Sequence, residues 1–196
     1  MAAVCGSCLL ATAASAQPAP SALPSGKQMR IVVPFAAGGT SDILARALAQ
    51  RLGDRLGRTV IVENRGGAGG SIGTEAVVQA DADGTVILIH SGAIAVEPSL
   101  QRNPRYDVRR DLAPVTTAVV GPFVLLVHPE VPVNSTADPI KYVKANPGKL
   151  NYGTPGVGSS IHVTTEYFKT LAGIDLVHVP YKGAGPALVA AMSNEI

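Results

Sequence analysis

Three glycine-rich turns, each lying between an apolar run and an amphipathic segment, most limit what this chain can fold into. They are residues 36–41 (AAGGTS), 66–71 (GGAGGS) and 156–160 (GVGSS). A repeated order of strand, turn and helix is typical of parallel sheets whose two faces are covered by helices. The sequence therefore predicts an α/β fold.

The first half of the chain follows this order closely. Short apolar, β-branched runs predict strands over residues 30–34, 59–64 and 85–90. Helices are expected over residues 41–56 and about 71–79; in the first, leucines recur at every fourth position. Thr40, Ser41 and Asp42 are available to cap the N-terminus of that helix.

The pattern changes after Asp111, where two apolar runs (residues 113–120 and 123–128) are separated only by Gly121 and Pro122. Such a change often marks the passage into a second domain. Beyond it we expect a helix over about 136–145 capped by Ser135, strands over 150–153 and 176–179, and helices over about 160–171 and from Pro186. The predicted division is a first lobe over residues 29–112 and an incomplete second lobe over 113–196.

Composition excludes several functions. Net charge is only +2, with acidic and basic residues interspersed, so a nucleic-acid partner is not expected. Aromatic residues make up 4% of the chain and Trp is absent, which removes the stacking platforms that sugars and single-stranded bases need. A ligand is therefore expected to be held by backbone and hydroxyl groups.

The N-terminus has the character of an export signal. Residues 1–16 are uncharged and mostly apolar or small, and they end in Ala14-Ser15-Ala16, which suits cleavage before Gln17. No Lys or Arg precedes the apolar stretch, so the alternative is a different start codon or a different role. Residues 17–28 are expected to form a mobile leader. Both cysteines, Cys5 and Cys8, lie in the predicted signal, so cleavage would leave no thiol for catalysis, zinc binding or disulfides.

The three turns fall where an anion can bind. The first turn of a helix has unpaired N–H groups and partial positive charge, and glycine lets an anion approach them closely. Neighbouring Ser and Thr hydroxyls add donors. The alternative is that glycine only tightens each turn. Asp42 is either a simple cap or a ligand contact, and Lys182 is either a positive charge for a carboxylate or a solvated side chain.

Other chemistries fit poorly. Gly67, Gly69 and Gly73 are spaced one residue too widely for a dinucleotide fingerprint, and no acidic residue ends the next predicted strand. No phosphate-binding loop, zinc-type histidine pair or nucleophile elbow occurs. His90, His128 and His178 are expected to be structural. His162 follows the third turn and either orders that loop, faces the ligand or caps the helix.

Several segments, in this order, resemble the solute-binding proteins of tripartite tricarboxylate transporters, the Bug family. They are IVVPFAAGGTSDILARALAQRL, VIVENRGGAGGSIGTEAV, DGTVILIH, PGKLNYGTPGVGSSIHVTTEYFK and DLVHVPYKGAGPAL. The resemblance runs from about Met29 to the end and implies a type II periplasmic-binding clamshell of two α/β lobes. It implies no enzyme activity, no cofactor and no metal.

The resemblance also implies a site. A small carboxylate would lie between the lobes, partly held through ordered water, and the closed form would deliver it to membrane permease subunits. The residues at matching positions come from the strand-to-helix turns of both lobes. They are Phe35, Ala36, Gly38, Gly39, Thr40, Ser41, Asp42, Gly69, Gly70, Ser71, Ser91, Gly156, Gly158, Ser159, Ser160, His162, Tyr181, Lys182 and Gly183.

Two departures from the family pattern stand out. Glu97 precedes Pro98 where the family commonly has Asn. The family also continues for roughly another half domain, so a fragment is expected, with sheet edges left uncovered. A periplasmic, monomeric receptor is the leading hypothesis. The alternatives are an exported carboxylate sensor for a membrane kinase and a nucleotide-cofactor-dependent enzyme.

Overall fold

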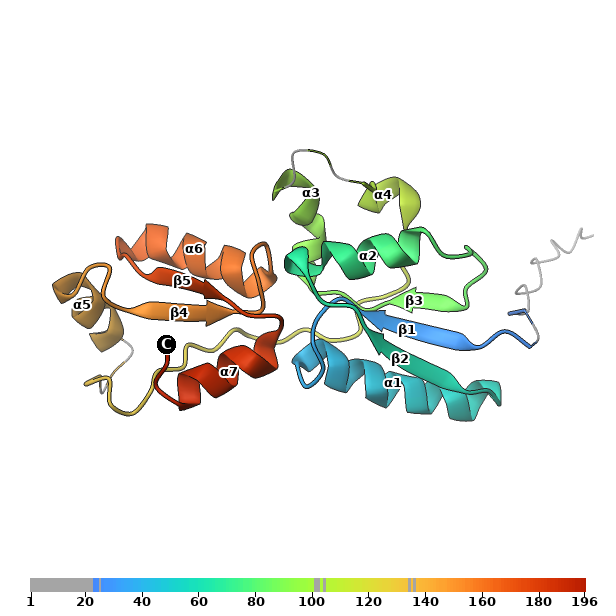
Figure 1. The fold of residues 1–196 in the computed structure, drawn as a ribbon, viewed down its shortest axis with the longest axis horizontal. Coiled ribbons are helices and arrows are strands. Elements are labelled where there is room, and N and C mark those ends of the chain that lie inside the picture. Colours follow the sequence, from blue (N-terminus) through green and yellow to red (C-terminus); the bar gives the residue numbers. More distant parts are fainter. Residues whose placement is uncertain (1–22, 25, 101–102, 104, 134, 136) are drawn as a thin grey trace, which may run out of the picture.

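The computed structural model describes residues 23–24, 26–100, 103, 105–133, 135 and 137–196. The predicted signal peptide and most of the predicted leader lie outside the described residues. The described chain forms two lobes joined by an irregular segment (Figure 1). Each lobe has its own parallel sheet, so the predicted α/β architecture is confirmed.

The first lobe contains a three-stranded sheet in the order β2-β1-β3. Its strands are β1 (Met29–Val33), β2 (Val60–Asn64) and β3 (Val86–Leu88), all parallel. The central strand is almost entirely buried because helices cover both faces of the sheet, α1 on one and α2 on the other (Figure 1). The ends of these parallel strands bring the turns that follow them to one edge.

Helix α1 (Thr40–Leu56) packs on β1 through Ala45 and Ala49, which form a core with Ile31, Val33 and Phe35. The helix begins after Gly39, whose extended backbone supplies the N-cap without any side-chain hydrogen bond. The expected side-chain cap from residues 40–42 is therefore wrong, because the chain enters the helix one residue earlier, at a glycine. The helix ends at Gly57, which adopts the left-handed conformation common at C-caps.

Short helices complete the first lobe. A 3₁₀ turn, η1 (Ala68–Gly70), leads into α2 (Ser71–Val78), and η2 (Gly92–Ala95) follows β3. Helices α3 (Glu97–Leu100) and α4 (Val108–Asp111) come next. The two apolar runs at 113–120 and 123–128 then form the irregular segment between the lobes, with Val120 91% exposed and Val124 73% exposed.

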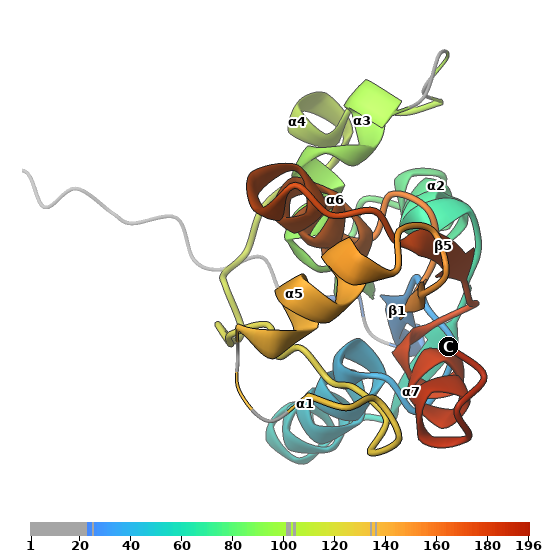
Figure 2. The same cartoon turned by 90° about the vertical axis from the view of Figure 1, so that its left-hand side faces the viewer.

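The second lobe contains β4 (Asn151–Thr154) and β5 (Val177–Pro180), which pair in parallel. Helices α5 (Asp138–Ala145), α6 (Ser160–Ala172) and α7 (Ala184–Met192) surround them (Figure 2). The expected Ser135 cap of α5 is wrong. The helix begins at Asp138 after Ala137, with Pro139 in its first turn, where the missing N–H costs nothing.

The first sheet precedes residue 112 in the sequence and the second follows residue 113. The exact boundary between the lobes at this point stays a prediction. None of the helices in the described part of the chain is both long and apolar enough to cross a membrane.

Candidate functional site

The two lobes meet through their glycine-rich turns. The Ala36 N–H in the first turn donates a hydrogen bond to the Lys182 carbonyl oxygen of the second lobe at 2.9 Å. A Cβ on Gly39 would lie 3.7 Å from the Cβ of Ala184, the first residue of α7. The N-terminal ends of α1 and α7 therefore lie next to each other.

The second and third turns meet in the same way. Gly69 has φ +70°, and a Cβ there would lie 2.2 Å from the Val157 carbonyl oxygen. Ordinary contacts begin near 3.4 Å, so only glycine allows this approach. The N-terminal ends of α2 and α6 thus also reach the junction, which makes four helix N-termini from two lobes at one place (Figure 1).

Unpaired backbone donors lie at this junction. In α1 the first bonded amides of the helix are those of Asp42 and Ile43, both to Gly39 O, so within the described chain the Thr40 and Ser41 N–H groups have no acceptor. In α6 the first bonded amide is that of His162. Because each helix N-terminus also carries partial positive charge, the junction is suited to an anion.

Asp42 shapes the first turn. Its buried carboxylate accepts the Gly38 N–H at 2.9 Å, Arg46 Nε at 3.0 Å and Asn64 Nδ2 at 3.0 Å. The Arg46 hydrogen bond is the main cause that holds the pKa of this carboxyl below its usual range. Both oxygens are thus used within the protein, and Asp42 orders the turn in this structure.

Ser159 and His162 order the third turn. Ser159, the N-cap of α6, accepts the His162 N–H through its hydroxyl oxygen at 3.3 Å. The His162 ring turns back, and its Nδ1 accepts the Gly158 N–H at 3.2 Å. The ring also stacks on His178, with centroids 4.2 Å apart. Of the predicted roles for His162, the structure shows loop ordering.

The remaining predicted residues occupy different surroundings. Lys182 has an exposed side chain, and its carbonyl oxygen makes the contact between lobes. Tyr181 lies against β4, since a Cβ on Gly153 would be 3.2 Å from its ring. Its hydroxyl is buried without a hydrogen-bond partner among the described residues, as is the Ser91 hydroxyl. The assignment of all these residues to ligand binding stays a prediction.

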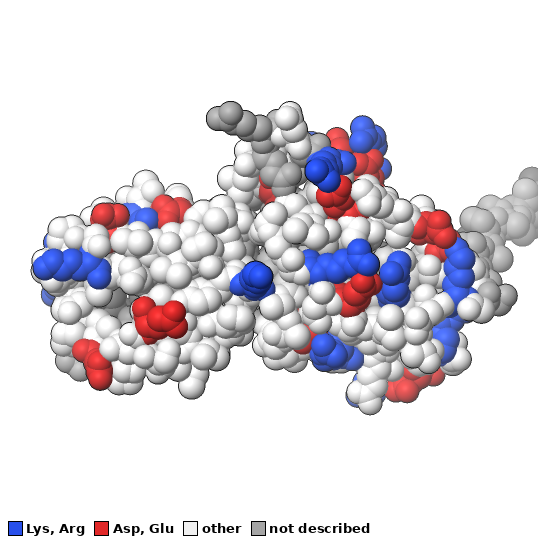
Figure 3. Space-filling view, in the orientation of Figure 1, with Lys and Arg blue, Asp and Glu red and all other residues white. Residues whose placement is uncertain are grey.

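A cavity of about 440 Å³ opens between the lobes beside the N-terminus of α2. Its walls include Ser71, Glu97 and Tyr106 from the first lobe and Val157 and Gly158 from the second. The volume lies in the range of ordinary small-ligand pockets. Over the visible face of the junction, basic side chains lie among mostly uncharged residues (Figure 3).

Two cavity residues, Glu97 and Tyr106, were absent from the predicted site. In the sequence, Glu97 stands out only as a departure from the family pattern, and Tyr106 follows a stretch with no periodic pattern. Both side chains are buried, Glu97 at 2% and Tyr106 at 5% exposure, and the Tyr106 hydroxyl donates to Glu97 Oε2 at 2.6 Å.

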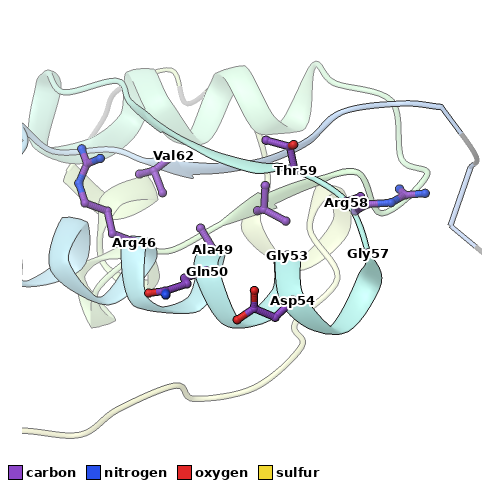
Figure 4. Close-up of a pocket in the computed structure, with 10 residues that line it drawn as sticks. Arg46, Ala49, Gln50, Gly53, Asp54, Gly57, Arg58, Thr59 and Val62 are labelled. Atoms are coloured by element: carbon purple, nitrogen blue, oxygen red, sulfur yellow. The ribbon is translucent and has the colours of Figure 1, made fainter.

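A second hollow of about 690 Å³ lies along α1 and β2, away from the glycine-rich turns (Figure 4). It is lined by residues of the first lobe alone, including the charged residues Arg46, Asp54 and Arg58. It contains none of the glycines, hydroxyl groups or helix N-termini of the junction. Within the described residues, no group of three or more His, Cys, Asp or Glu side chains could hold a metal ion.

Comparison with known proteins identifies the class. Residues 44–196 match the model described as the tripartite tricarboxylate transporter family receptor. The chain belongs to this family. Protein BugT of Bordetella pertussis is 39% identical over 189 residues, covering 95% of this chain and 58% of BugT. A second protein of the same organism, described as a UPF0065 protein, is 39% identical over 173 residues, covering 87% of this chain and 53% of the relative.

Solved structures agree with the family. One described as a periplasmic transporter has 38% identity and a TM-score of 0.82, over 88% of this chain and 58% of the other. MatC from Rhodopseudomonas palustris with bound malate has 29% identity and a TM-score of 0.79, over 86% and 58%. A further R. palustris protein, solved with adipate, has 33% identity and a TM-score of 0.75, over 88% and 58%.

These matches confirm the predicted clamshell class and the predicted family. The family is one of receptors, and its structural relatives are described as periplasmic binding or transport proteins, so the prediction that the chain is not an enzyme is confirmed. The chain spans little more than half the length of the relatives it matches.

Proposed function

We propose that this protein is a solute receptor that captures a small carboxylate between its two lobes and delivers it to a membrane transporter. The observation that carries this proposal is the meeting of four helix N-termini, two from each lobe, at glycine-rich turns with unpaired N–H groups. A carboxylate is small enough to accept several such N–H groups at once.

The composition of the junction favours a carboxylate over other ligands. Donors come mainly from the backbone, and aromatic platforms for a sugar or nucleobase are scarce in the sequence. Two structural relatives hold malate and adipate, which are small carboxylic acids. The predicted residues of the turns, from Phe35 to Gly183, are proposed to surround the ligand directly or to shape the turns that do.

Location and partner are part of the same proposal. Export with cleavage after Ala16 would place the receptor outside the cytoplasm, where structural relatives described as periplasmic work. Membrane permease subunits would then receive the ligand from a monomeric receptor. An exported sensor for a membrane kinase would use the same fold; permease or kinase genes beside this one would separate the two roles.

Thermal melting with a ligand panel tests the binding step. Mono-, di- and tricarboxylates would be compared with NAD and neutral sugars as controls. A ligand at about a hundred times its Kd adds roughly 2.7 kcal/mol of stability, which for a chain of this size raises the Tm by about 5–10 °C. A rise confined to carboxylates supports the receptor, whereas a rise only with NAD would overturn it.

A further inference from the structure

A histidine side chain holds the third glycine-rich turn through a backbone hydrogen bond. The Gly158 N–H donates to Nδ1 of His162, in the first turn of α6, at 3.2 Å. Gly158 is buried and lines the cavity of about 440 Å³ between the lobes. A Cβ there would lie 3.1 Å from Leu100 Cδ1 of the first lobe. The part of the turn that His162 holds is therefore also the part that contacts the opposite lobe.

This hydrogen bond fixes the protonation state of the ring. A backbone N–H can only donate, so His162 Nδ1 carries no proton and the ring is neutral, with its one proton on Nε2. A doubly protonated imidazole has no acceptor and cannot keep the bond. Proton uptake by His162 would thus leave the buried Gly158 N–H without its partner among the described residues. An unpaired buried donor destabilises the conformation that contains it.

A second histidine lies against the first. His178 of β5 stacks on the His162 ring with centroids 4.2 Å apart, and its Nε2 lies 2.7 Å from Thr154 Oγ1. Burial lowers the pKa of His178, and the charge interaction with His162 is the next cause. Two positively charged rings in contact repel each other, so the pair is expected to take up a single proton. Because burial disfavours a charge on His178, that proton is expected on His162.

The other ionisable groups near the ring already have partners. Glu166, one helical turn after His162, interacts with the charge of that ring, but its carboxylate accepts Lys169 Nζ at 2.9 Å and the Tyr152 hydroxyl. The third turn and η2, which also contacts α6, have no ionisable side chains. Among the described residues around the ring, the imidazoles are therefore the groups whose charge changes between neutral and mildly acidic pH.

The same turn supplies donors proposed to hold the ligand. The first hydrogen-bonded amide of α6 is that of His162, so within the described chain the Ser160 and Ile161 N–H groups have no acceptor. The bond between Gly158 and His162 closes the loop in front of these donors and keeps them aligned. A positive charge is unfavourable at the N-terminus of a helix, so a protonated His162 would also be repelled from its present position. Acidification should therefore release the turn.

We propose that His162 is a positioning residue and an acid-sensitive latch: its neutral ring holds the third glycine-rich turn in the conformation that binds ligand, and its protonation releases the turn and weakens binding. The release of the turn is argued from contacts within the second lobe. The effect on the ligand rests on the proposed function.

Amide hydrogen exchange measured by NMR tests the release of the turn. After correction for intrinsic exchange, protection of the Gly158 N–H in the unmodified chain should fall roughly tenfold between about pH 7.5 and about pH 5.5, the range over which imidazoles titrate. The ring nitrogen resonances of His162 should titrate with the same midpoint, a comparison that needs no variant. His162→Gln should abolish the pH dependence of this protection. Protection that does not follow the titration of His162 would overturn the inference.

Calorimetric titration at both pH values tests the effect on binding, with the carboxylate that raises the Tm most in the melting panel. On acidification the Kd of the unmodified chain should rise roughly three- to tenfold more than that of His162→Gln, because the variant experiences the same titration of the ligand. His162→Asn serves if the Gln variant does not fold, as judged by its melting curve.

His128→Gln is the matched control. His128 Nδ1 also accepts a backbone N–H, that of Glu130 at 3.3 Å, but it lies in the irregular segment outside the third turn, so this variant should keep the full pH dependence. An equal rise in Kd in the His162 variants and the unmodified chain, or tighter binding at the lower pH, would overturn the inference. Absence of all carboxylate binding would instead overturn the proposed function, and the exchange experiment would still decide whether His162 holds the turn.

Discussion

Substitution of Gly69 by alanine should distinguish the effect of the contact between the lobes from effects on the stability of either lobe. Gly69 has φ +70°, a conformation that costs a non-glycine residue roughly 1 kcal/mol or more. Its new Cβ would also lie 2.2 Å from the Val157 carbonyl oxygen, which is backbone of the opposite lobe. The turns must therefore separate until this distance reaches at least 3.4 Å.

Gly57→Ala is the matched control. Gly57 has φ +61° at the C-cap of α1, and nothing lies within 4 Å of a Cβ there. Both variants pay the backbone cost, which corresponds to a Tm lower by about 2–4 °C for a chain of this size. Only Gly69→Ala moves the N-terminus of α2 away from that of α6.

Ligand affinity provides the decisive assay. A carboxylate bridging the two turns would lose at least one charge-assisted hydrogen bond, about 1.5–3 kcal/mol, which corresponds to at least a tenfold rise in Kd. Calorimetric titration with the best carboxylate from the melting panel measures this rise. If Gly69→Ala binds as tightly as Gly57→Ala, the ligand does not lie between these turns and the reasoning fails.

Three further predictions concern the residues that order the site. Asp42→Asn should lower the free energy of unfolding, measured by urea denaturation, by about 1–3 kcal/mol because it removes a buried carboxylate that accepts three hydrogen bonds. Asp54→Asn, at an exposed position, should change this free energy little. Ser159→Ala should cost about 1 kcal/mol by removing the α6 cap, and an unchanged urea midpoint would contradict that role. Burial, and after it the charge interaction with nearby His162, lowers the pKa of His178 in the folded protein. As the pH falls, His178 therefore binds a proton in the unfolded chain before it does so in the folded one. Stability should therefore decrease from about pH 6.5 downward through the folded pKa, and His178→Gln should remove part of that decrease; equal slopes in both proteins would refute it.

Much of the fold could be predicted because the periodic patterns are local. The β-branched run at 30–34 predicts a buried strand, and the leucine repeat of 41–56 predicts the helix that covers it; the structure places β1 and α1 within one residue of these limits. Side-chain caps were less predictable. Any of Thr40, Ser41 and Asp42 can cap a helix, but Gly39 takes that position, and Asp42 instead accepts the Gly38 N–H.

The turns of the candidate site were predictable, but its side-chain surroundings were not. Glycines between strand and helix show where backbone donors will lie, because parallel strands end at one edge of a sheet. Nothing local shows that His90, Glu97 and Tyr106 will pack together, since each contact joins segments that only the tertiary fold brings together. The same holds for Tyr181, whose side chain lies against β4.

This difference has a consequence for ligand recognition. Backbone N–H groups at helix ends bind any carboxylate in much the same way, so the glycine-rich turns define a class of ligand and leave its identity open. Identity must then depend on the few side chains that line the cavity, and specificity is a difference between affinities that a single repulsive charge can set.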